Sequence, residues 1–93
     1  MAIELNSVLV RSGDLVESRI DDDIVMMSVE TGRYYGLAHV GARVWALLAE
    51  PMEVSALCER LLLEYRVEPE RCRSDVIAFL QRMAEEGLVV AKP

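Results

Sequence analysis

Residues 34–45 have the sequence YYGLAHVGARVW, and the pattern of apolar residues in the chain changes within this stretch. Before about residue 38 the apolar residues alternate with polar ones or form short runs, as in β-strands. After it they recur at helical spacing. Strands followed by helices in 93 residues predict a single α+β domain spanning residues 1–93, with an ordered core from about residue 8 to residue 90.

The part of the chain before this stretch predicts an antiparallel meander. The segment from Val16 to Ile20 alternates apolar and polar side chains, which is typical of a half-buried strand. The next apolar run has almost no polar position, which indicates a strand in the middle of its sheet or one covered on both faces. Gly32, which is free to adopt positive φ, suits the tight connection into the third strand. The expected strands are residues 16–20, 24–29 and 34–37, with further candidate strands at 7–12 and 88–90.

The part after this stretch predicts three helices. From Val54 to Tyr65 apolar residues recur at i, i+3, i+4, i+7, i+8 and i+11, the clearest helical signal in the chain. Pro69 suits the first turn of the last helix, and Gly87 suits the position just after its end. The expected helices are residues 40–49, 53–65 and 69–86. The predicted architecture is a winged helix-turn-helix, in which a three-stranded antiparallel sheet is followed by three helices.

Charge and hydropathy exclude several classes of protein. The net charge is −6, with ten Lys and Arg against sixteen Asp and Glu and no basic cluster, which weighs against nucleic acid as the partner. No apolar run approaches the length of a membrane span, and the N-terminus lacks the basic start and apolar stretch of a signal peptide. We therefore expect a cytoplasmic protein that binds neither membrane nor nucleic acid.

Candidate catalytic and metal-binding residues are few. Cys58, Cys72 and His39 are the whole set of thiol and imidazole ligands, which is too few for a structural zinc site without carboxylates. The run Asp21-Asp22-Asp23 lacks the spaced carboxylates of a calcium loop, and a solvated turn is the better interpretation. There is no glycine-rich phosphate loop. The sequence therefore predicts no enzyme activity, no cofactor and no metal, with Cys58 a buried thiol and Cys72 left open as a surface thiol.

The last helix has more apolar surface than one packing face requires. Ile77, Leu80 and Ala84 form one stripe, and Val76, Phe79 and Met83 form a second at the same spacing. One interpretation is a wide core face; the other is that the second stripe lines a groove for a peptide. If residues 34–37 end the meander, one edge of that strand is unpaired and open to an incoming strand.

The ordered combination of these residues resembles a known family. The segment ETGRYYGL (30–37), the segment VGARVW (40–45), and the run from Asp75 through Phe79, Leu80 and Met83 to Gly87-Leu88 are similar to the PqqD-like proteins. These proteins are precursor-peptide recognition elements of ribosomal natural-product pathways. The similarity covers about residues 8–90, and the YYGL form in so short a chain resembles the recognition proteins of lasso-peptide clusters.

This resemblance implies a function and a site. Such proteins bind the leader of a precursor peptide as an extra antiparallel strand between the third strand and the third helix. The leader typically offers a Tyr, a Pro and a Leu to apolar pockets; a separate transglutaminase-like peptidase then removes it, and a cyclase closes the ring. Carried over by position, the strand wall is Arg33, Tyr34, Tyr35 and Gly36, the helix wall is Val76, Phe79, Leu80 and Met83, and Asp75 is available to a basic leader residue.

One position departs from the family pattern, and two other functions remain open. Many relatives carry a helix-capping Asn where this chain has Ala38, so we expect His39 or a water molecule to cap the first helix. The first alternative function is a winged-helix DNA-binding regulator, which shares the helix order but requires a basic recognition helix. The second is a structural subunit that docks permanently on an enzyme through its apolar stripe.

Overall fold

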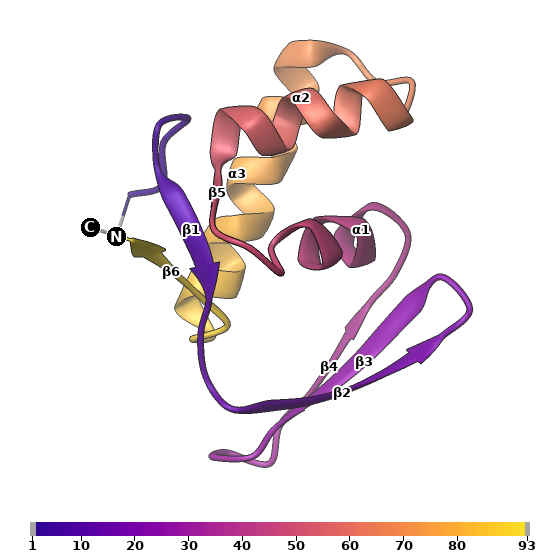
Figure 1. Ribbon diagram of the computed structural model, residues 1–93, viewed down its shortest axis with the longest axis vertical. Coiled ribbons are helices and arrows are strands. Elements are labelled where there is room, and N and C mark those ends of the chain that lie inside the picture. Colours follow the sequence, from indigo (N-terminus) through magenta and orange to yellow (C-terminus); the bar gives the residue numbers. More distant parts are fainter. Residues whose placement is uncertain (1, 93) are drawn as a thin grey trace.

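The computed structural model describes residues 2–92, which form three helices and two small sheets (Figure 1). The strands are β1 (Val8–Arg11), β2 (Leu15–Ile20), β3 (Asp23–Ser28), β4 (Tyr34–Leu37), β5 (Met52–Glu53) and β6 (Val89–Lys92). The helices are α1 (Val40–Leu47), α2 (Val54–Glu64) and α3 (Pro69–Glu85).

The predicted three-stranded antiparallel sheet is confirmed as the sheet β2-β3-β4. β3, the most apolar of the three strands, lies in the middle and pairs with β2 on one side and β4 on the other. Its Ile24 and Met26 are buried against the helices, whereas Val25 is 37% exposed on the other face. The interpretation of full cover on both faces is therefore wrong, and the central position in the sheet is right.

The N-terminal strand does not join this meander. β1 instead pairs with β6 and β5 in a second antiparallel sheet of order β5-β1-β6. Gly13, at φ 84°, turns the chain between the sheets, and the Ser12 N–H donates to the Leu88 carbonyl at 2.9 Å. Figure 1 shows the β5-β1-β6 sheet on the left and the β2-β3-β4 sheet below α1. β1 lies between two partners, and its Leu9 is completely buried.

Side chains from all three helices fill the core between the sheets. The stripe predicted on α2 is buried at Val54, Leu57, Cys58 and Leu61. α3 ends as expected: Gly87, at φ 77°, and Leu88 donate to the carbonyls of Ala84 and Met83, which closes the last turn. The buried residues of the other two helices are Ala42, Val44 and Trp45 in α1 and Cys72, Val76, Leu80 and Met83 in α3.

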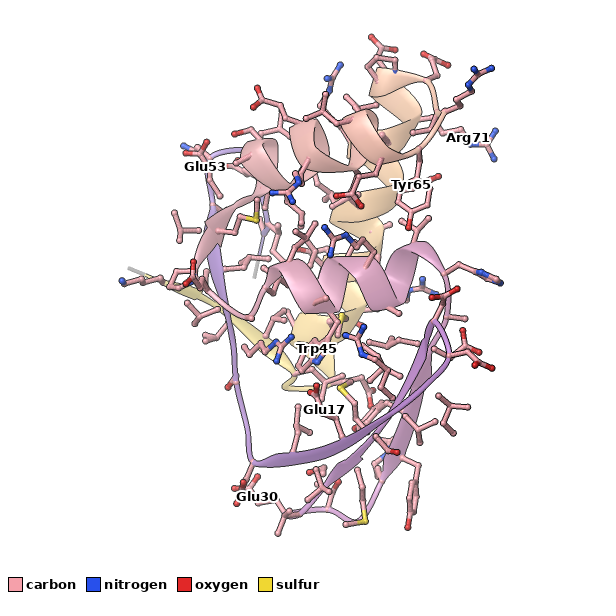
Figure 2. The ribbon with its side chains drawn as sticks, turned by 45° about the vertical axis from the view of Figure 1, so that its right-hand side comes forward. Glu17, Glu30, Trp45, Glu53, Tyr65 and Arg71 are labelled. Atoms are coloured by element: carbon pink, nitrogen blue, oxygen red, sulfur yellow. The ribbon has the colours of Figure 1, made fainter. Side chains whose placement is uncertain are left out.

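Trp45 connects α1 to both sheets. Its indole N–H donates to the Glu17 carboxylate at 2.9 Å, and Figure 2 shows the two side chains facing one another below α1. The Arg11 guanidinium lies over the indole ring, 4.4 Å from its centroid, and donates through Nε to the Trp45 carbonyl at 3.2 Å. Arg11 and Glu17 also form an ion pair at 3.7 Å. This network fixes α1 against β1 and β2.

The junction between β4 and α1 is a tight turn at His39. This residue has φ 53° and ψ −121°, a conformation that side chains disfavour, and its imidazole makes no capping hydrogen bond. The expected capping by the His39 side chain is therefore not found. Instead the Gly41 N–H donates to the Ala38 carbonyl at 3.1 Å, so the turn itself supplies a partner to the start of the helix.

Candidate functional site

The outer edge of β4 is unpaired within residues 2–92, since β4 hydrogen-bonds only to β3. The Ser28 N–H donates to the Arg33 carbonyl at 2.9 Å, which identifies this opposed pair as hydrogen-bonded. Hydrogen-bonded and non-bonded pairs alternate along an antiparallel ladder, so Tyr35 and Leu37 also bond to β3. The peptide groups of Tyr34 and Gly36 therefore point away from the sheet, and each offers one N–H and one C=O to an incoming strand.

Side chains along β4 alternate between two faces. Tyr35 and Leu37 are half-buried and pack against the core below the helices. Tyr34, at 71% exposure, and Gly36 lie on the open face of the sheet, which no helix of residues 2–92 covers (Figure 1). A strand added at this edge therefore directs alternate side chains toward the helices and toward solvent.

The predicted helix wall is only partly at the surface. Val76, Leu80 and Met83 are buried, with exposures of 4%, 0% and 4%, whereas Phe79 is half-buried. A Cβ atom on Gly41 would lie 3.4 Å from the Phe79 ring, so the glycine lets α1 approach this aromatic side chain closely. The buried stripe of α3 is Cys72, Val76, Leu80 and Met83, which takes members from both expected stripes and leaves Phe79 as the half-buried member of the helix wall.

A cavity of about 440 Å³ opens where α1, α2 and α3 meet. Phe79 and Val76 form one side, Val40 and Gly41 the side nearest β4, and Tyr65 lies at the end of α2. The remaining lining residues are Val44, Leu61, Arg66, Val67, Cys72 and Asp75. The lining is mainly apolar, and its charged members, Arg66 and Asp75, are exposed to solvent. The Asp75 carboxylate also meets Arg71 at 3.7 Å. This arrangement suits an apolar side chain of a ligand rather than a reaction.

No residue of β4 lines this cavity, and the start of β4 meets the end of α3 through charged side chains instead. Arg33, just before β4, forms an ion pair at 3.3 Å with Glu86 at the end of α3. Burial, then the hydrogen bond and charge of the same carboxylate, raise the pKa of Tyr35. Glu86 thus connects the two predicted walls. Sequence reasoning missed it, because nothing local distinguishes one glutamate at a helix end from its neighbours.

The two cysteine thiols lie together in the core, and Cys72 also lines the cavity. Cys58 and Cys72 are both buried and adjacent, so the surface alternative for Cys72 is wrong. Burial, followed by the neighbouring thiol, raises the pKa of Cys58 to about 11. Among residues 2–92 no group of three His, Cys, Asp or Glu side chains is placed to hold a metal ion. No helix in the same range is long and apolar enough to span a membrane.

Comparison with known proteins gives a family and a fold. Residues 23–89 match the family model described as coenzyme PQQ synthesis protein D (PqqD). A solved structure described as TbiB1 in complex with the TbiA(beta) leader peptide is 31% identical, with a TM-score of 0.82, over 90% of this chain and 98% of that one. A second, lasso peptide synthetase B1 complexed with the leader peptide, is 20% identical, with a TM-score of 0.78, over 88% of this chain and 96% of that one, and it supports the fold. A search of curated proteins gave no match.

Proposed function

This chain belongs to the PqqD family, and from that premise we propose that it binds the leader segment of a ribosomally made precursor peptide and presents it to a processing enzyme. The observation that carries the proposal is the free β4 edge, whose outward N–H and C=O groups lie at Tyr34 and Gly36. The 31% identical relative was solved with a leader peptide, which supports the same class of ligand here.

The proposed site combines strand pairing with apolar contacts. A leader strand beside β4 contacts the predicted strand wall of Arg33, Tyr34, Tyr35 and Gly36, and its inward side chains meet α3. Val76 and Phe79 make the direct helix contacts, with Leu80 and Met83 behind them. Asp75, an exposed residue of the cavity lining, is placed to attract a basic residue of the leader.

The direction of the bound leader follows from antiparallel pairing. β4 runs toward α1, where Val40 and Gly41 line the cavity. An antiparallel leader therefore has its N-terminal side at the cavity and its C-terminal side at the Arg33–Glu86 ion pair. The core peptide, which follows the leader, emerges at the charged end of the site and is free to reach a peptidase and a cyclase.

The expected affinity is moderate. Burial of two or three leader side chains contributes about 1.5–3 kcal/mol each. Each backbone hydrogen bond to the β4 edge adds about 0.5–1.5 kcal/mol net. Ordering a flexible leader opposes these gains by several kcal/mol. A dissociation constant between nanomolar and micromolar follows, which suits a cytoplasmic carrier that performs no chemistry and must release its cargo.

The test is titration of wild type and three variants with a fluorescent synthetic leader, the TbiA(beta) leader with which the 31% identical relative was solved. Phe79→Asp places a charge on the cavity wall and is expected to abolish binding with the circular dichroism spectrum retained. Leu63→Asp, the matched control, changes a side chain that is 85% exposed on α2 and should leave binding unchanged. Leu61→Asp should unfold the protein, because that side chain is 1% exposed.

The outcomes separate this proposal from its alternatives. Wild-type affinity in Phe79→Asp refutes the site. Saturable leader binding that Phe79→Asp removes supports it. Salt-dependent binding of duplex DNA with no leader binding indicates a regulator, and stable co-purification with an enzyme without leader binding indicates a structural subunit.

A further inference from the structure

The open face of the β2-β3-β4 sheet has a gap at Gly36. A Cβ atom placed on this residue would meet nothing within 4 Å. Val25 lies directly opposite on β3, with 37% of its surface exposed, and Tyr34 lies two residues away on the same face, with 71% exposed. The gap is therefore bounded on two sides by apolar or aromatic side chains and has a backbone floor.

The gap lies beside the edge at which the leader is proposed to pair. Residues opposite one another on neighbouring strands share a face, so the leader residue paired with Gly36 points to the open face. Two strand spacings, about 9.6 Å, separate that residue from Val25. A small side chain cannot cover this distance. An aromatic side chain lying across the bare glycine reaches Val25 and flanks Tyr34.

We infer that Gly36, Val25 and Tyr34 form a second subsite, on the face of the sheet opposite the helices, that takes an aromatic side chain from the bound peptide. The inference rests on the proposed function, since it requires a peptide strand at β4. It adds a requirement on the peptide. One aromatic residue faces the second subsite, and the residues before and after it face the helices, because side chains alternate along a strand.

The experiment selects binders from a displayed library of randomised peptides, of about sixteen residues to span the edge and cavity, with wild type, Gly36→Val and Val16→Thr as baits. Val at position 36 puts a side chain into the gap, and its Cβ meets no atom within 4 Å. Val16 is on the same open face but on β2, opposite Met27, so it is out of the peptide's reach and serves as the control.

Wild type and Val16→Thr are expected to enrich one aromatic position between two apolar ones, and Gly36→Val to lose that enrichment. In purified peptides, changing this aromatic residue to Ala should weaken binding to wild type about two- to five-fold, and to Gly36→Val by clearly less. The same aromatic preference in all three baits, or none in wild type, overturns the inference but leaves leader binding intact. Failure to select any peptide that competes with the leader overturns both.

Discussion

Gly36→Pro tests the β4 edge directly, because it removes a backbone N–H that makes no hydrogen bond within the β2-β3-β4 sheet. The Gly36 N–H points away from β3, and proline is tolerated on an edge strand when its nitrogen faces solvent. Glycine-to-proline replacement also restricts the unfolded chain, which offsets part of any strain. We therefore expect the free energy of unfolding to change by less than about 1 kcal/mol.

Binding should change far more than stability. The carbonyl of the incoming strand loses its donor and is left unsatisfied in the complex, which costs about 1–3 kcal/mol. A total loss of about 1–3 kcal/mol corresponds to roughly 5- to 150-fold weaker binding. Gly36→Ala is the matched control: it keeps the N–H, its Cβ meets nothing within 4 Å, and it should bind within about two-fold of wild type.

Fluorescence anisotropy with the labelled leader measures the affinities, and urea unfolding followed by circular dichroism measures stability. The reasoning is refuted if Gly36→Pro binds as tightly as Gly36→Ala while both remain folded. It is also refuted if the proline variant unfolds, because the Gly36 N–H would then have to serve the internal ladder.

Three further predictions concern stability. His39→Gly should raise the free energy of unfolding by about 1 kcal/mol, or the melting temperature by about 4–8 °C, because glycine accepts φ 53°; an equal gain in His39→Ala would contradict this. Glu17→Ala should lower the free energy of unfolding in urea by about 1–3 kcal/mol, because it leaves the buried Trp45 N–H without an acceptor. Glu17→Gln keeps an acceptor and should lower it by less. Equal losses in the two variants would argue against the hydrogen bond. The hydrogen bond from Arg43 lowers the pKa of Glu64, so its stabilisation is present above the ordinary carboxyl pKa and is lost as pH falls through the lowered value. The melting temperature of Glu64→Gln, measured across the acidic pH range, should therefore fall less with decreasing pH than that of wild type. If the two proteins give the same pH profile, the Arg43–Glu64 pair is not the source of the loss of stability in acid.

Most of the secondary structure is visible in the sequence because it depends on local pattern. The apolar residues from Val54 onward are spaced so that a helix places them on one face, and α2 buries that face in the core. Gly87 ends α3 because the closing turn needs positive φ, a requirement of a single residue. The predicted bounds of α1 extend two residues too far, since the last residues before Pro51 form a turn.

The candidate site is predictable only in part. Residues on β4 were correctly placed beside an edge, because a short terminal strand of a meander has one free side. Which of them present their peptide groups outward depends on the pairing with β3, and a shift of one residue would exchange Tyr34 for Tyr35. The burial of Leu80 and Met83 depends likewise on the rotation of α3 against the core, which helical spacing alone leaves open.

The sequence by itself determined the order of the helices and of every strand except β5, the ends of α3 and the apolar stripe of α2, because each depends on residues within a few positions of one another. Tertiary structure alone decided the pairing of β1 with β5 and β6, the contact of Glu86 with Arg33, and the approach of Gly41 to Phe79. These contacts join residues about 40 to 80 positions apart, and their partners are selected by the packing of the whole core.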